Sequence, residues 1–377
     1  MKVAFFTESL PPSTDGVANT LNRLANTLVA KDIEFYFFST FKPDENTEWT
    51  DRVFKVASFP LYFIYPHYRV GVPALHNIDD MLDDFKPDII HAVTPTPLGL
   101  RGLNYAREKK IPAVSSYHTH FVDYFKYYKL QSMEHIGWNY LKWFYNQFDR
   151  IYVPSPSTAN ELRARGFGKL ELWARGIDTA MFSPNKRSDE LRRSIGVTDE
   201  PILLFVGRLV KEKDLDDLIE ANSILKAQGS RYKIVVVGDG HMREQLETEM
   251  PDAHFTGYLY GEELAKWYAS SDIFAFPSTT ETFGNVILEA SASGLPIVGV
   301  DKGSVQDLIR HNSTGFVAKA NDPIDFAASL LPLIEDSAKR KEMGGNAQEL
   351  AKQYSWDAIN SRLVHSYQRM IFNYSMN

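Results

Sequence analysis

The chain has 377 residues, of which 44% are hydrophobic and 24% charged, so its length suits two globular domains better than one core. A net charge of −7 leaves no basic excess to displace counterions, which argues against nucleic acid as a partner. The absence of cysteine excludes disulfides, thiolate catalysis and cysteine-ligated metals, and it is compatible with a reducing compartment.

The first residues, MKVAFFTESLPP, are typical of a buried strand and lack the basic and then apolar plan of a signal peptide. No apolar run approaches the roughly 18 residues that a membrane span needs. We therefore expect a cytoplasmic protein, either soluble or peripheral on the inner face of the membrane.

Short apolar runs recur along the chain, with helical stretches between them. In the first half they are KVAFFTES, IEFYFFST, DIIHAVTP, IPAVSSYH and RIYVPSPS, and in the second PILLFVGR, YKIVVVGDG, AHFTGYL, DIFAFPS, LPIVGVD and GFVAKA. Most are apolar on both faces, as parallel strands covered by helices are. This alternation occurs twice, which predicts an α/β fold with two doubly wound, Rossmann-like domains.

A polar stretch with a proline, residues 176–190, separates the two series. We expect one domain over residues 1–178 and a second over residues 179–355. Apolar residues at helical spacing predict a helix within 356–377, which we expect to pack back on the first domain.

In open α/β sheets the ligand binds outside the carboxyl ends of the strands, so polar residues that follow strands are the candidates. We expect the two domains to face each other and to place these residues in a cleft. The first candidate is the STDGV turn at 13–17, where Gly16 lets the backbone approach a ligand at a helix start. An ordinary tight turn explains the same residues.

Two cations, Arg208 and Lys213, follow the strand in VGRLVKEKD and could neutralise a diphosphate leaving group. The alternative is a solvated basic loop in which Glu212 and Asp214 are the partners. The acidic run at 214–217 is interpreted as the solvated face of a helix.

The segment VVVGDGHMREQL only partly matches a dinucleotide fingerprint. The third glycine is missing at Arg243, and no acidic residue ends the following strand, which argues against NAD binding and a dehydrogenase.

His118 follows another strand, where it could donate a hydrogen bond to a sugar oxygen or relay a proton. An ordinary half-buried histidine is the alternative. A metal site made with His120 is discounted, because no carboxylate-rich motif lies nearby.

The segment TETFGNVILE places Glu281 and Glu289 on either side of Gly284, which is expected to open a helix. Both glutamates would favour helix formation, which is a structural explanation. A functional explanation is that the amides of Phe283, Gly284 and Asn285 face an anion between the two carboxylates.

Together with VGDG, FTGYLYGEELAKWYASSD and ASGLPIVG, these motifs resemble the retaining nucleotide-sugar glycosyltransferases of family GT4, which have the GT-B fold. The resemblance covers nearly the whole chain. SYHTH, LWARGIDTAMFSP and YASSD look most like the branch of sulfoquinovosyl-diacylglycerol synthases and GDP-mannose-dependent lipid mannosyltransferases.

The resemblance implies that the first domain binds the acceptor and the second binds the nucleotide sugar. Glu281 would bind hydroxyls of the transferred hexose, and Glu289 the ribose. The remaining contacts would be His118 to the hexose, Arg208, Lys213 and Gly16 to the diphosphate, Phe283, Gly284 and Asn285 to sugar or phosphate, and the backbone near Gly257 and Tyr258 to the base. The family often has a Gly-Gly pair where Asp15-Gly16 stands here.

The resemblance implies retention of configuration, and because no enzymic nucleophile is evident we expect front-face attack. We expect no metal requirement, because Arg208 and Lys213 take a divalent ion's role. The donor would be GDP-mannose or a UDP-hexose. Residues 59–70 and 121–130 mix aromatic and basic side chains, which suits a membrane interface and ordinary aromatic packing equally. The resemblance to the lipid-acting branch of the family favours a lipid or lipid-linked glycan acceptor. A soluble acceptor and a non-catalytic sugar-nucleotide-binding protein are the alternatives.

Overall fold

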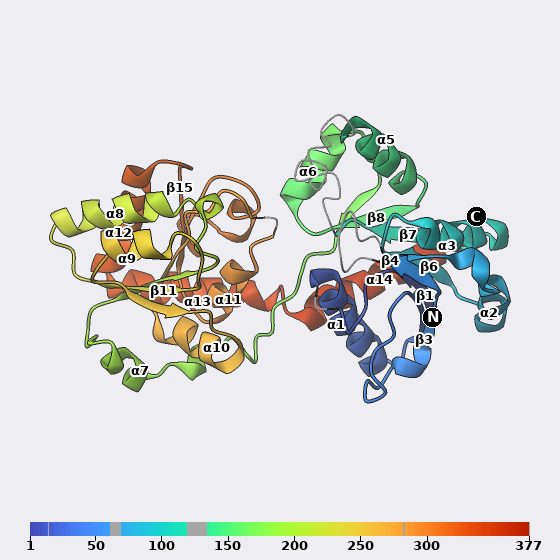
Figure 1. The fold of residues 1–377 in the computed structure, drawn as a ribbon, viewed down its shortest axis with the longest axis horizontal. Helices are drawn as coiled ribbons and strands as arrows, with labels where there is room; N and C mark the ends of the chain where they lie inside the picture. Colours follow the sequence, from blue (N-terminus) through green and yellow to red (C-terminus); the bar gives the residue numbers. More distant parts are fainter. Residues whose placement is uncertain (14, 61–68, 119–133, 282, 377) are drawn as a thin grey trace. The chain divides into compact units, whose positions relative to one another are not determined.

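The computed structural model describes residues 1–13, 15–60, 69–118, 134–281 and 283–376, and the chain divides into two compact units (Figure 1). Unit 1 comprises Met1–Ala174 and Ile359–Asn377, and unit 2 is the continuous segment Arg175–Ala358. Both units alternate strands with helices around a parallel sheet. The prediction of two Rossmann-like α/β domains is therefore confirmed.

The sheet of unit 1 has the strand order β3-β2-β1-β6-β7-β8-β9 within the described residues. Its strands are β1 (Lys2–Thr7), β2 (Glu34–Ser39), β3 (Val53–Lys55), β6 (Ile89–Ala92), β7 (Ala113–Ser116), β8 (Arg150–Val153) and β9 (Leu170–Leu172). A small antiparallel pair, β4 (Ser58–Pro60) and β5 (Arg69–Gly71), accompanies it. The strand order reverses direction between β1 and β6, which is where sheets of this type bind ligands.

The helices of unit 1 begin at residues suited to capping. Asp15, Thr96 and Ser155 each accept hydrogen bonds from amides of the first turn, and proline follows two of these caps. The helices are α1 (Gly16–Ala30), α2 (Ile78–Phe85), α3 (Pro97–Lys109), α5 (Glu134–Tyr145), α6 (Pro156–Ala164) and the last helix, α14 (Trp356–Ser375).

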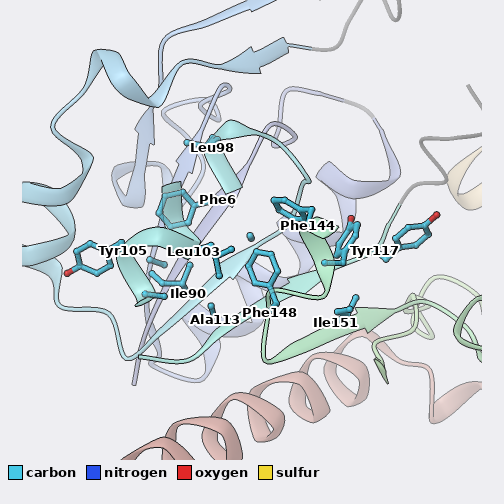
Figure 2. Close-up of a cluster of buried hydrophobic side chains, with 14 of the residues drawn as sticks. Phe6, Ile90, Leu98, Leu103, Tyr105, Ala113, Tyr117, Phe144, Phe148 and Ile151 are labelled. Atoms are coloured by element: carbon cyan, nitrogen blue, oxygen red, sulfur yellow. The ribbon is translucent and has the colours of Figure 1, made fainter. Parts of the chain in front are cut away.

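One large hydrophobic cluster of unit 1 lies where α3 and α5 cover the sheet (Figure 2). Phe6 and Ile90 project from β1 and β6 towards α3, and Phe144 and Phe148 come from α5 and the residues after it. Gly102 lets α3 approach closely, because a Cβ there would lie 2.6 Å from a ring carbon of Phe6. The sheet is thereby held rigidly beneath the loops that leave its carboxyl end.

Unit 2 repeats this plan, with the strand order β12-β11-β10-β13-β14-β15 in the part of the chain that the structure describes. Its strands are β10 (Ile202–Val206), β11 (Lys233–Val237), β12 (His254–Gly257), β13 (Ile273–Ala275), β14 (Ile297–Val300) and β15 (Gly315–Ala318). Its helices are α7 (Asp189–Ser194), α8 (Leu215–Ala227), α9 (Arg243–Glu249), α10 (Gly261–Ser270), α11 (Asn285–Ala292), α12 (Pro323–Glu335) and α13 (Ser337–Lys352). Here the order reverses between β10 and β13.

Helix α14 begins in unit 2 and continues into unit 1. Within unit 1, the Asn360 amide donates to Thr27 Oγ1 at 3.0 Å, and Tyr152 donates to Ser366 Oγ at 2.8 Å. Tyr367 is buried against the ring of His91. The final helix thus completes the core of the unit in which the chain begins.

Candidate active site

The reversal point of the unit 2 sheet brings together two of the predicted site residues. Lys213 lies in the loop after β10, and Glu281 lies in the loop after β13. Their side chains form an ion pair, and both are largely buried, with 11% and 20% of the side-chain area exposed. Lys213 also lies over the ring of Phe276, with 5.9 Å between Nζ and the ring centroid. A charge pair at this point is suited to contact a polar ligand.

The two loops are tied to each other by a second acid. Asp214 Oδ2 accepts hydrogen bonds from the amide and the hydroxyl of Thr279, at 2.7 and 2.8 Å. Thr280 Oγ1 donates to the carbonyl of Glu212, and Ser304 Oγ donates to the carbonyl of Glu281 at 2.9 Å. These bonds fix the position of the loop that carries Lys213 relative to the loop that carries Glu281.

Helix α11 begins directly after this loop. Gly284 has φ 85° and ψ 50°, a left-handed conformation that favours glycine. Within the described residues, the amides of Phe283, Gly284 and Asn285 donate to no acceptor, as is usual for a first helical turn. These three amides and the positive end of α11 can therefore bind an anion.

Glu289 lies one turn into α11, and its Oε2 accepts a hydrogen bond from the hydroxyl of Tyr268 at 2.8 Å. Burial raises the pKa of Glu289, and the hydrogen bond from Tyr268 opposes this effect. Sequence analysis did not identify Tyr268, which lies on α10.

The Arg208 side chain is exposed and forms no hydrogen bond or ion pair with any residue that the structure describes. The loop that carries it packs on the VGDG turn, where a Cβ on Gly238 would lie 1.9 Å from the carbonyl oxygen of Gly207. A Cβ on Gly240 would lie 2.3 Å from the carbonyl oxygen of Leu209. Close packing between these two loops therefore explains the two glycines.

Gly257 ends strand β12, and Tyr258 follows it. The carbonyl of Gly257 already accepts from the amide of Gly238 at 2.8 Å, and the Tyr258 hydroxyl donates to the carbonyl of Asp239 at 2.9 Å. The Tyr258 ring stays half exposed and stacks on Tyr260. This leaves an aromatic surface beside the sheet edge.

In unit 1, Asp15 caps helix α1 and Gly16 is its first residue. Asp15 Oδ1 accepts from the amides of Val17 and Ala18, at 2.8 and 2.9 Å. Burial acts to raise the pKa of Asp15, but hydrogen bonds from Ser13, Ser9 and the two amides outweigh it and lower the pKa. This carboxylate occupies amides that a phosphate would otherwise use, so it weakens the case for a phosphate contact at Gly16.

His118 follows β7 and is half-buried, with its ring edge-on to Trp173 at a centroid distance of 5.0 Å. Beneath it, His91 is buried, and its ring nitrogens are hydrogen-bonded to Tyr367 and Ser116. Burial, and next the charge of His118, hold the pKa of His91 well below its usual range. His91 is therefore a neutral core residue below His118.

Two family models match the chain. The model described as Glycosyltransferase Family 4 matches residues 14–181, and the model described as Glycosyl transferases group 1 matches residues 187–350. A GDP-mannose-dependent alpha-mannosyltransferase of Corynebacterium glutamicum is 34% identical over 98% of this chain and 89% of its own length. The chain is a family 4 glycosyltransferase.

A second relative agrees with this assignment, and solved structures share the fold. The sulfoquinovosyl transferase SQD2 of Arabidopsis thaliana is 32% identical to this glycosyltransferase over 96% of the chain and 72% of its own length. The fold matches Anabaena HepE in complex with UDP, with a TM-score of 0.71 and 21% identity over 98% and 100% of the two chains. It also matches a sucrose-phosphate synthase of Thermosynechococcus elongatus, with a TM-score of 0.70 and 20% identity over 99% and 100%. The predicted GT-B fold is thus confirmed.

Asp214 requires a correction. The interpretation of residues 214–217 as a solvated helix face is wrong for Asp214, which has left-handed backbone angles and whose carboxylate binds Thr279. The alternative of a solvated basic loop is also wrong for Lys213, whose partner is Glu281. Residues 121–130 and most of 59–70 lie outside the described residues.

Sequence reasoning also missed Glu8, which follows β1 at the reversal point of the unit 1 sheet. Its side chain is 1% exposed, and Oε2 accepts a hydrogen bond from the hydroxyl of Thr94, which follows β6. Burial raises its pKa to about 7, although the Thr94 and Thr96 hydroxyls and the Gly71 amide act to lower it. A motif such as TES gives no sign of this burial.

No group of three or more His, Asp or Glu side chains among the described residues is placed to hold a metal ion. In the same part of the chain, no helix is both long and apolar enough to cross a bilayer.

Proposed function

We propose that this glycosyltransferase moves a hexose from GDP-mannose or a UDP-hexose to a lipid or lipid-linked glycan, with retention of configuration. The observation that carries the proposal is the similarity to a GDP-mannose-dependent alpha-mannosyltransferase over nearly the full length of both chains. The similarity to a sulfoquinovosyl transferase and to an alpha-monoglucosyldiacylglycerol synthase, which is 29% identical over 84% of this chain, supports the lipid acceptor.

For the donor, we assign the diphosphate to Arg208, Lys213 and the free amides at the start of α11. Arg208 offers an exposed guanidinium, and Lys213 offers an ammonium group beside Glu281. Glu281, now paired with Lys213, would accept hydrogen bonds from hexose hydroxyls, and Glu289 from the ribose. His118 is assigned to the hexose, and the backbone at Gly257 and Tyr258 to the base. Gly16 is assigned to the diphosphate as the weaker contact, because Asp15 already occupies the amides of Val17 and Ala18.

In the proposed reaction, the bond between the anomeric carbon and the diphosphate oxygen breaks. The acceptor oxygen forms its new bond on the same face, and its proton passes to the departing phosphate. The diphosphate gains negative charge as it leaves, so fixed positive charge at Arg208 and Lys213 stabilises the transition state. We propose that these cations make a divalent metal unnecessary.

Calorimetric titration with GDP and UDP in the presence of a chelator tests the donor site. Tight binding of one nucleotide fixes the donor class, and binding of neither contradicts the proposal. Incubation of the matching sugar nucleotide with membrane lipid extract, followed by NMR of the product, then tests transfer and the anomeric configuration. A product formed only on water-soluble sugars would favour the soluble acceptor.

The Glu281→Ala variant should lose transfer while nucleotide binding persists. Glu212→Ala is the matched control, because Glu212 is an exposed acid in the same region whose carboxylate forms no ion pair with a described residue. Normal transfer by Glu281→Ala would overturn the assignment.

A further inference from the structure

Helix α5 exposes a row of large apolar side chains. Ile136, Tyr140 and Trp143 are separated by four and three residues, so they lie on one face of the helix. Ile136 and Trp143 are 61% and 53% exposed, while the opposite face buries Leu141, Phe144 and Tyr145 in the core. Exposed apolar rows of this kind mark interaction surfaces.

The edge beside this apolar face is basic. Lys142 is exposed on α5 and forms no ion pair with any described residue. Its Nζ lies close to Gly166, which follows α6, and the Arg165 guanidinium stacks on Trp138 of α5 at 4.2 Å from the ring centroid. Figure 1 shows α5 and α6 as neighbours at the periphery of unit 1. Of these two cations, only Arg165 has an acidic partner, Glu161 at 2.9 Å.

The Tyr140 side chain has a hydrogen-bonded hydroxyl and a partly exposed ring. Its hydroxyl donates to the carbonyl of Pro95 at 2.9 Å, while its ring stays 39% exposed beside Trp143. Burial of the aliphatic and aromatic side chains at headgroup depth, with lysine and arginine at phosphate level, is how peripheral helices lie on a bilayer. Lys142, which has no acidic partner among the described residues, adds electrostatic attraction to an anionic lipid surface.

We propose that this face of α5, with Ile136, Tyr140 and Trp143 flanked by Lys142 and Arg165, docks the enzyme on an anionic lipid surface. The inference rests on the proposed lipid acceptor, for which it supplies the contact with the membrane. Docking through unit 1 places the acceptor-binding unit at the surface where a lipid acceptor resides.

Co-flotation with vesicles tests the proposal. The full-length protein is mixed with phosphatidylcholine vesicles, with or without phosphatidylglycerol as about a third of the lipid. We expect binding to the anionic vesicles that high salt weakens. Trp143→Ser should lower the partition coefficient roughly tenfold or more, because the indole no longer enters the interface.

Lys142→Ala should lower partition about fivefold on anionic vesicles and leave the neutral vesicles unaffected, since one charge near the surface is removed. Leu172→Ser is the matched control, because Leu172 is also 53% exposed and lies in unit 1, but on β9. This control should change partition by less than about twofold. Circular dichroism confirms that each variant is folded.

Equal partition of Trp143→Ser and Leu172→Ser would overturn the proposal. So would a wild-type dimer that Trp143→Ser dissociates in the absence of vesicle binding, because the face would then belong to a second copy. Nucleotide titration of the same samples distinguishes a failure of the proposed function from a failure of the α5 docking proposal. Failure to bind GDP and UDP contradicts the proposed function, whereas vesicle binding judges the α5 face alone.

Discussion

Replacement of Glu8 by glutamine should stabilise the protein in mildly alkaline solution and have almost no effect in mildly acidic solution. The Glu8 carboxyl is buried at the carboxyl end of β1, and one of its oxygens, Oε1, has no hydrogen bond of ordinary geometry within the described residues. Glutamine retains the shape and can accept the hydrogen bond from Thr94, but it carries no charge. Only the cost of burying an ionised group is removed.

The size of the effect follows from the pKa of Glu8. In the unfolded chain the carboxyl titrates near its ordinary value of 4.5, and in the folded protein burial raises the pKa to about 7. Between pH 4.5 and pH 7 the Glu8 carboxyl is protonated in the folded state but ionised in the unfolded chain. The contribution of protonated Glu8 to the unfolding free energy is therefore complete below pH 4.5 and is lost as the pH rises through 7. At about 1.4 kcal/mol for each pKa unit, the loss in unfolding free energy is about 3 kcal/mol.

Urea unfolding at about pH 5 and about pH 8.5, followed by circular dichroism, measures this difference. Glu8→Gln should exceed the wild type by about 3 kcal/mol at the higher pH and by under about 1 kcal/mol at the lower. Glu45→Gln, an exposed carboxylate in the same unit, should change stability by less than about 0.5 kcal/mol at both. A Glu8→Gln variant that is less stable than the wild type by the same amount at both pH values would refute the reasoning.

Three further predictions concern the two sheets. Glu281→Ala should lower turnover by about 10²-fold or more with little change in nucleotide affinity, and steady-state kinetics with calorimetry would detect the opposite pattern. Tyr268→Phe removes the hydrogen bond that lowers the pKa of Glu289, so more of this carboxyl is protonated in acid and fewer carboxylates can accept from the ribose. Nucleotide affinity should therefore fall more at about pH 6 than at about pH 8, and an equal loss at both would contradict the assignment. Asp15→Ala removes the cap of α1 and should cost about 1–2 kcal/mol near neutral pH, an effect that shrinks in acid because the folded pKa is lowered; urea unfolding that shows no loss would exclude the capping role.

The strands could be predicted because most are buried on both faces. Runs such as ILLFV and KIVVV are too apolar and too short for a surface helix, and each became a central strand. The edge strands β3 and β9 were not predicted, because three residues such as VFK and LEL show no periodicity. Their position depends on pairing with β2 and β8.

The candidate site could be located from sequence only as far as the ends of strands. Arg208 and Glu281 were found because each follows an apolar run. The pairing of Lys213 with Glu281 spans 68 residues and arises from the adjacency of β10 and β13, which no local pattern encodes. The burial of Glu8 likewise depends on Thr40 and Thr94, which lie 32 and 86 residues further along the chain.

The chain path through the two units has a consequence for biosynthesis. Unit 2 is one uninterrupted segment, whereas unit 1 needs α14, which is made after it. Until α14 emerges, His91 lacks the hydroxyl of Tyr367 and Tyr152 lacks that of Ser366, so two buried polar groups stay unsatisfied. We therefore expect the second half of the nascent chain to reach its native state first, while the first half remains the segment most dependent on chaperones during synthesis.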